Sequence, residues 1–224
     1  DLVLVDKPAG LLTVPLDGDS AAPSVQALLW ERFRSHRQLE PLVVHRIDKD
    51  TSGLVLFALH ERARASLVAQ FAQRTPDRVY LALVNGQPEP AAGVWQDRLA
   101  WDEDAFVQRR ARPEDPDARD ASCAYRVVTT FIETTLLEIR LHTGRQGQIR
   151  AQAQLHGHSL VGDRRYRPRA GAPGNALRFT RQALHAQRLA FDHPADGRRV
   201  EFTAPTPPDL RELLEKLRRQ ARQG

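Results

Sequence analysis

Two aspartates stand in a short polar segment, His45–Gly53, which reads HRIDKDTSG. Apolar runs over residues 42–44 and 53–59 flank this segment and have the composition of strands, so we expect a loop between two strands. Catalytic groups are common on loops that a rigid scaffold holds. A carboxylate there can act as a nucleophile or stabilise charge that develops in a reaction. Taken alone, the pattern favours the simpler interpretation that Asp48 or Asp50 caps a turn.

A second candidate segment is Thr143–Arg150, which reads TGRQGQIR. An apolar run leads into Gly144 and a helical pattern begins at about Gln146, which predicts a strand followed by a helix. Arg145 and Arg150 would then lie at the strand end and in the first helical turns, where an arginine can lean over a neighbouring strand. By itself this segment is better explained by two solvated arginines near a phosphate or a carboxylate.

A third candidate segment, Arg78–Ala82, has the composition of a strand. Arg78 and Tyr80 are two residues apart, so in a strand their side chains point to the same face. An aromatic ring beside a cation could stack on a base and hold a phosphate. Alone, the segment is more typical of a tyrosine packed in a core with its hydroxyl in water.

The elements that must position these residues mix strands and helices without a regular alternation, which favours a mixed or antiparallel α+β fold over a doubly wound parallel sheet. We find no internal repeat and no domain boundary, so we expect one domain over residues 1–224. The chain has no methionine and its first residues resemble a strand, so we expect it to begin downstream of the natural N-terminus. The expected strands cover residues 2–5, 11–14, 42–44, 53–59, 78–85, 94–99, 106–110, 121–130, 134–142, 183–191 and 198–202, and the expected helices cover 25–37, 61–74, 146–156 and a last segment from 207.

The composition favours a nucleic-acid partner and argues against several other classes. The formal net charge is +5 and the surplus is almost wholly arginine, whose planar fork suits phosphates and bases. No apolar run approaches the roughly 18 residues that span a bilayer, and no signal peptide opens the chain, so we expect a cytoplasmic protein. The single cysteine, Cys123, cannot form an intrachain disulfide and is expected to be a small buried residue. The histidines at 142, 156, 158 and 185 lack a metal-site spacing and are expected to face solvent or RNA.

These segments occur in an order that resembles one family across essentially the whole chain. The landmarks are Val5–Leu11, His45–Gly53, Arg78–Ala82, Thr143–Arg150 and Leu184–Pro194. Together they resemble the RluA-type pseudouridine synthases of the RluA/RsuA superfamily. The resemblance implies a bent, mostly antiparallel mixed sheet with flanking helices and a central RNA-binding cleft. It also implies isomerisation of uridine to pseudouridine in structured ribosomal or transfer RNA.

The resemblance assigns roles to the catalytic residues. Asp48 matches the family's catalytic aspartate, and Arg150 matches the arginine that pairs with it. Tyr80 matches the tyrosine that stacks on the target base and is a candidate for proton transfer at C5. A paired arginine favours the ionised form of a carboxylate that lies desolvated beneath the base. The resemblance implies neither a metal nor an organic cofactor.

Four further residues are expected to contact the substrate. Ile149 and Leu184 match apolar positions that wall the base pocket. Arg46 matches a position that helps to fill the space left by the flipped nucleotide, and Arg145 is expected to contact the RNA. Flipping a base out of folded RNA costs a few kcal/mol, and contacts between arginines and phosphates can offset that cost. We expect a monomer that binds neither DNA nor a membrane and that carries no S4-like domain within residues 1–224.

Two departures keep an alternative open. The family usually has histidine where Gly147 and Gln152 stand, and we expect these changes to alter RNA contacts or the setting of Arg150. A non-catalytic RNA-binding or RNA-folding protein on the same scaffold is therefore the alternative. A nucleoside or glycoside hydrolase is a third possibility, although such enzymes usually need two carboxylates and a water. One carboxylate, one arginine and apolar walls suit isomerisation better than hydrolysis.

Overall fold

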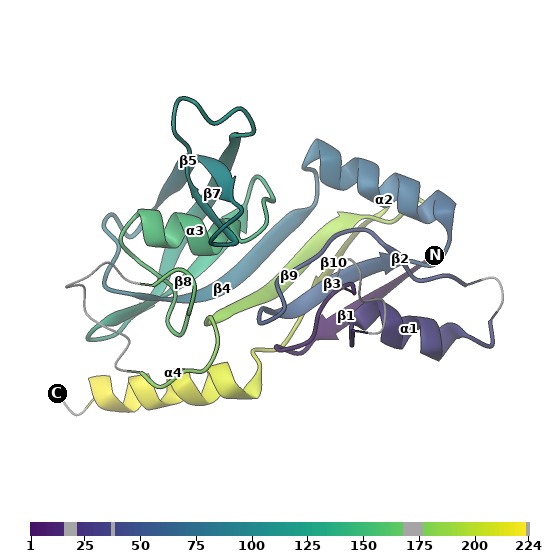
Figure 1. Cartoon of the computed structure of the whole chain (residues 1–224). Helices are drawn as coiled ribbons and strands as arrows, with labels where there is room; N and C mark the ends of the chain where they lie inside the picture. The colour runs from purple at the N-terminus through teal and green to yellow at the C-terminus, as the bar shows by residue number, and fades with distance from the viewer. Residues whose placement is uncertain (16–21, 37–38, 168–176, 223–224) are drawn as a thin grey trace. The chain divides into compact units, whose positions relative to one another are not determined.

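The structure is a computed structural model that describes residues 1–15, 22–36, 39–167 and 177–222 (Figure 1). It divides into two compact units, which we describe separately. Unit 1 consists of Asp1–Arg78 and Ala186–Pro205, and unit 2 consists of Val79–His185 and Thr206–Gly224. No helix within the described ranges is long and apolar enough to cross a membrane.

Unit 1 is built around a buried strand, β3 (Ser52–Ala58), whose seven residues are all buried. β1 (Leu2–Lys7) runs antiparallel to it, from the pair Leu2 and Ala58 to the pair Lys7 and Gly53. The other elements are α1 (Val25–Phe33), β2 (Leu42–Val43), α2 (Glu61–Gln73), β10 (Arg199–Thr203) and the part of β9 (Leu184–Asp192) from Ala186 onward. β2 pairs with β3, β9 is the other neighbour of β3, and β10 pairs antiparallel with β9.

The core of unit 1 follows from the apolar faces of these elements. Leu54, Leu56 and Phe191 pack with Leu67, a residue of α2 that is fully buried. α2 ends because Arg74 adopts a left-handed conformation, with φ of 62°. This core holds the two strands that border the His45–Gly53 segment.

Unit 2 contains an antiparallel sheet in the order β4-β8-β7-β5-β6. Its strands are the part of β4 (Asp77–Asn85) from Val79 onward, β5 (Ala92–Asp102), β6 (Val107–Arg110), β7 (Arg119–Thr130) and β8 (Thr134–Leu141), and its helices are α3 (Gln148–Leu155) and α4 (Pro208–Ala221). α4 buries Leu210, Leu214 and Leu217 in one cluster with Leu83 and Phe131. α3 packs against β5 and β6.

The expected α+β class is confirmed, and most strands lie where the sequence predicts them. The strand expected over 11–14 is wrong, since Leu12 forms only an isolated bridge with Ser24. The Thr13 side chain there bonds to the backbone of Ile47, which fixes the segment as a loop. The expected helix over 25–37 ends at Phe33, and residue 37 lies outside the described residues.

Candidate functional site

The Asp48 loop lies between β2 and β3, as the sequence predicts, and its backbone is held at three consecutive carbonyls. The Ile47 oxygen accepts from Thr13 Oγ1 at 2.8 Å, and the Asp48 oxygen accepts from the Thr51 amide at 3.1 Å. The Lys49 oxygen accepts from Lys7 Nζ at 2.8 Å and from the Gly10 amide at 3.0 Å. The loop is therefore a fixed support for the half-buried Asp48 side chain.

Lys7 has a role that the sequence did not indicate. Its side chain is fully buried, and its ammonium donates to the backbone oxygens of Pro8, Leu11 and Lys49 at 2.9, 2.7 and 2.8 Å. Burying a cation is costly unless it is compensated, and carbonyl oxygens provide that compensation here. The segment Val5–Leu11, which in the sequence was only one landmark of the family, thus anchors the Asp48 loop.

Gly53, the second residue of β3, follows this loop and marks a close approach of two backbones. Its φ is +108°, and an added Cβ would overlap the backbone oxygen of Ala186 on β9. Only glycine combines that conformation with that contact. The position therefore fixes how the end of the Asp48 loop meets the neighbouring strand.

His45 is not a proton donor near neutral pH. Its Nε2 accepts from the Leu56 amide at 3.1 Å, and its ring stacks on Phe71 at 4.6 Å between centroids. Burial, and to a lesser extent the charge of Arg78, lowers the pKa of His45 to about 3. Arg78 itself lies over the Phe71 ring, 5.7 Å from its centroid. His45 is therefore a neutral structural acceptor at the start of the loop.

Acidification from pH 7 to pH 5 is expected to lower the free energy of unfolding by about 2 kcal/mol through His45. The unfolded histidine takes up its proton near pH 6.5, while the folded one does so only near pH 3. The stabilising contribution is thus present above pH 6.5 and is lost progressively as the pH falls from there towards 3. Urea unfolding at both pH values measures the loss. His45→Gln keeps an acceptor but does not titrate, and an equal loss in that variant would contradict the assignment.

Arg46 and the predicted residues of unit 2 have contrasting environments. Arg46 is exposed, as suits a residue that enters a gap in RNA. Tyr80 on β4, Ile149 on α3 and Leu184 at the start of β9 are buried, with 8%, 4% and 4% of their surfaces exposed. Arg145 is half-buried, and its Nε donates to the Asp120 backbone oxygen at 3.3 Å.

Arg150 forms a bidentate ion pair with an aspartate that the sequence did not single out. Its Nε lies 2.7 Å from Asp163 Oδ2, and its Nη2 lies 3.0 Å from Asp163 Oδ1. The guanidinium also lies over the Tyr166 ring, 4.9 Å from its centroid. The structure thus brings Arg150 and Ile149 together on α3, whereas the pairing of Arg150 with Asp48 stays a prediction.

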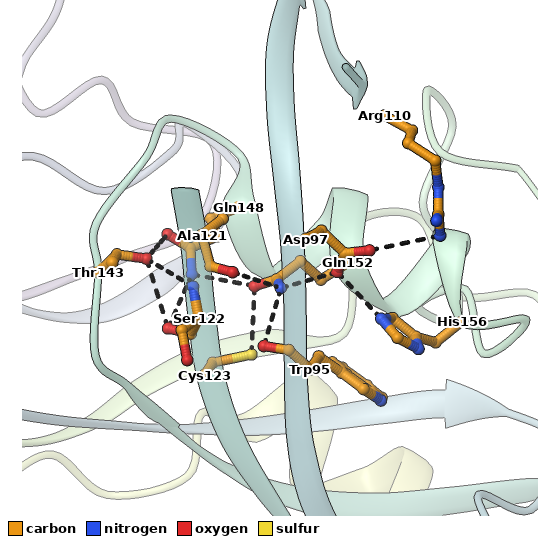
Figure 2. Close-up of polar contacts among 10 residues, drawn as sticks. All are labelled: Trp95, Asp97, Arg110, Ala121, Ser122, Cys123, Thr143, Gln148, Gln152 and His156. Carbon is orange, nitrogen blue, oxygen red and sulfur yellow. Dashed lines mark hydrogen bonds and ion pairs between the residues drawn. The ribbon is translucent and has the colours of Figure 1, made fainter. Parts of the chain in front are cut away.

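Gln152 lies on the buried face of α3 and has no exposed surface, so it cannot contact RNA directly (Figure 2). Its Nε2 donates to the backbone oxygens of Trp95 and Ala121 at 3.1 and 3.3 Å. The same atom donates to Asp97 Oδ2 at 2.9 Å. These contacts tie α3 to β5 and β7. Of the two expected effects of the departure at Gln152, a direct change in RNA contacts is therefore excluded, and an altered setting of Arg150 on the same helix stays a prediction.

A second amide on the same face of α3 extends this network (Figure 2). Gln148 Nε2 donates to Gln152 Oε1 at 3.0 Å and to the Ser122 oxygen at 3.1 Å. Gln148 Oε1 accepts from Thr143 Oγ1 at 2.7 Å and from the Arg145 amide at 3.0 Å. The network therefore fixes both the helix and the loop that leads into it.

Gln152→Leu is expected to lower the free energy of unfolding by about 2–4 kcal/mol, because it leaves several buried polar groups without this partner. Chemical denaturation measures the loss. Gln154→Leu, the same change at a half-buried position of the same helix, is the control and should cost less than about 1 kcal/mol. Equal losses in the two variants would contradict the role of the network.

The second departure, Gly147, also has a local explanation. Its φ of +63° is in the left-handed region, and an added Cβ would lie 3.1 Å from the Tyr166 hydroxyl. A histidine at this position would therefore be strained in its backbone, and the Tyr166 hydroxyl would have to shift slightly. The same conformation sets the start of α3 at Gln148, two residues after the expected start at Gln146.

Two of the remaining titratable candidates, Cys123 and His185, belong to the interior, whereas His142 and His156 are exposed, as expected. Cys123 is buried, as predicted, and burial with the nearby charge of Asp97 raises the pKa of its thiol to about 12. The expectation that His185 faces solvent or RNA is wrong, because its side chain is fully buried. Among the described residues, no group of three or more His, Cys, Asp and Glu side chains could hold a metal ion.

Comparison with known sequences gives one consistent result. The profile of a family described as RNA pseudouridylate synthase matches residues 1–155. An uncharacterized RNA pseudouridine synthase of Chloroflexus aurantiacus is 39% identical over 223 residues, which cover 96% of this chain and 66% of the relative. A ribosomal large subunit pseudouridine synthase D of Zymomonas mobilis is 38% identical over 223 residues, which cover 96% of this chain and 70% of the relative. The chain thus spans about two thirds of the length of these relatives.

Solved structures support the fold independently. One solved structure is that of the human protein named RNA Pseudouridylate Synthase Domain Containing 4. It superposes with a TM-score of 0.77 and 22% identity, over 97% of this chain and 90% of that one. A second is that of the human protein named RNA Pseudouridylate Synthase Domain Containing 1. It gives a TM-score of 0.74 and 23% identity, over 97% of this chain and 91% of that one. At these identities the likeness establishes the fold alone.

Proposed function

The chain belongs to the RNA pseudouridylate synthase family, and we propose that it isomerises uridine to pseudouridine in structured RNA with Asp48 as the catalytic carboxylate. The observation that carries the proposal is the Asp48 loop itself. Three consecutive backbone carbonyls, from Ile47 to Lys49, are fixed by hydrogen bonds, so the carboxylate projects from a rigid support. Catalysis needs such fixed placement, because a small displacement of a reacting group costs a large part of the rate.

The reaction breaks the bond between N1 of the uracil and C1′ of the ribose, turns the base and joins C5 to C1′. Asp48 either attacks C1′ or the base, or assists through a glycal. Arg150 keeps Asp48 ionised beneath the base. Tyr80 stacks on the base and takes part in removing the proton from C5. No atoms are gained or lost overall, because one proton leaves C5 and another is taken up at N1.

The apolar walls retain the detached base. Ile149 and Leu184 are buried, as suits residues that exclude water. Exclusion of water matters, since hydrolysis at C1′ would release uracil. Arg46 takes the space of the flipped nucleotide, and Arg145 contacts the RNA backbone. RNA lies in a central cleft of one catalytic domain over residues 1–224.

The substrate we propose is ribosomal RNA of the large subunit, as the names of several relatives indicate. Transfer RNA is the alternative within the same chemistry. The excess of arginine, which gives a net charge of +5, suits a polyanionic partner. We place the protein in the cytoplasm as a monomer, without a cofactor and without binding to DNA.

Product analysis distinguishes isomerisation from the two alternatives. Purified protein is incubated with an RNA that carries uridine labelled in the base, and the RNA is then digested to nucleosides. Labelled pseudouridine in the digest supports the proposal. Free labelled uracil would show a hydrolase, and unchanged uridine with retained RNA binding would show a non-catalytic RNA-binding protein.

A further inference from the structure

The loop that follows α3 contains an aspartate whose whole side chain is withdrawn from solvent. Asp163 has 0% of its side chain exposed, while that of Arg150 is 13% exposed. Both carboxylate oxygens contact Arg150, at 2.7 and 3.0 Å. This is the two-pronged geometry that fixes a guanidinium within its own plane.

Asp163 is itself rigidly placed. Its Oδ1 also accepts from the backbone amides of Arg165 and Tyr166, each at 3.0 Å. The preceding Gly162 has φ of +76°, and an added Cβ there would overlap the Arg181 backbone oxygen. The carboxylate therefore has little freedom to follow Arg150, and Arg150 must adjust to it.

Tyr166 fixes the other orientation of the guanidinium. Its ring lies beneath Arg150 at 4.9 Å, and its hydroxyl accepts from the Gln108 amide of β6 at 2.6 Å. Stacking on a ring sets the plane of a guanidinium, and the carboxylate sets its rotation within that plane. A long arginine side chain is otherwise free to adopt many rotamers.

We propose that Asp163 is a positioning residue for Arg150 and that Tyr166 supports it, an inference that rests on the proposed function because Arg150 takes part in the reaction there. A buried ion pair contributes little net stability in general, so stability alone does not account for this arrangement. The pair is also neutral as a whole. In the proposed reaction, Arg150 therefore acts as an oriented donor more than as an additional net charge.

A double-mutant cycle tests the inference through the single-turnover rate of pseudouridine formation and the affinity for RNA. Asp163→Asn is expected to slow the reaction about 10- to 100-fold and to change RNA affinity less than about twofold. In an Arg150→Ala background the same change is expected to have no further effect on the rate. Independent, multiplicative effects of the two substitutions would overturn the inference, as would a wild-type rate for Asp163→Asn.

Asp115→Asn is the matched control. Asp115 also forms a bidentate pair, with Arg109 at 2.6 and 2.8 Å, and also accepts a backbone amide, that of Arg112. The Asp115→Asn substitution should change the rate of pseudouridine formation less than about twofold. A loss of rate as large as that of Asp163→Asn would overturn the inference. All rates are measured below the melting temperature of each variant.

A second variant covers the case in which Asp163→Asn fails to fold. Tyr166→Leu removes the ring beneath Arg150 and keeps Asp163, and it should slow the reaction severalfold in the wild type but not in Arg150→Ala. Equal slowing in both backgrounds would overturn the inference. A wild-type rate for Arg150→Ala would instead overturn the role given to Arg150 in the proposed function. A failure of the proposed function can therefore be told apart from a failure of the inference about Asp163.

Discussion

Asp48→Asn is expected to lower the single-turnover rate of pseudouridine formation by about 10⁴-fold or more. The amide has nearly the shape of the carboxylate but neither its charge nor its nucleophilic electron pair. The described contacts that hold the loop use the backbone of residues 47–49, so the loop should keep its conformation. RNA affinity is therefore expected to change less than about threefold. Rapid mixing of excess enzyme with labelled RNA measures both quantities.

Asp50→Asn provides the control for this result. Asp50 lies in the same loop and is half-buried like Asp48, and the substitution makes the same chemical change. We expect its rate to stay within about fivefold of the wild type, since the reaction is assigned one carboxylate. If Asp50→Asn were inactive and Asp48→Asn active, the two aspartates would have to exchange roles.

Gly53→Ala is expected to have the largest effect on stability, with a loss of about 4 kcal/mol or more, or a failure to yield folded protein. The new Cβ would overlap the Ala186 backbone oxygen, and neither β3 nor β9 can move far without breaking its pairing. A residue with a side chain is also strained at φ of +108°. Thermal and urea unfolding measure the loss.

Gly197→Ala separates the overlap from the backbone strain. Gly197 also belongs to unit 1 and has a positive φ, +70°, but an added Cβ would meet nothing within 4 Å. Gly197→Ala should lower the free energy of unfolding by only about 1 kcal/mol. Similar losses in the two variants would show that the close approach of β3 and β9 does not set the cost.

The fold and the Asp48 loop could be predicted because their signals are local. Apolar runs on both sides of residues 45–53 predicted strands, and the structure places β2 and β3 there. The order of the landmarks then indicated the family. The exception was the strand over 11–14, where contacts between Thr13 and Ile47, 34 positions apart, determine the conformation. Composition within a short window contains no information about such a contact.

The supports of the site could not be predicted because they are charged or polar residues that are buried. Lys7, Gln152 and Asp163 belong to types that are usually exposed, so the sequence alone favours solvent for each. Each is buried because its partners come from distant parts of the chain or from a turn that a glycine permits. For the departure at Gln152, the sequence alone therefore left two effects open, on RNA contacts or on the setting of Arg150, and its burial in the interior leaves only the second as a direct effect.

The central claim is that this protein makes pseudouridine in RNA by means of Asp48. The most direct test maps every pseudouridine in the total RNA of a strain that lacks the gene, and again after complementation with the wild-type gene or with Asp48→Asn expressed at an equal level. The account predicts that specific pseudouridines, in ribosomal RNA of the large subunit, disappear on deletion and return with the wild type but not with Asp48→Asn. Their return with Asp48→Asn at the wild-type level would contradict it.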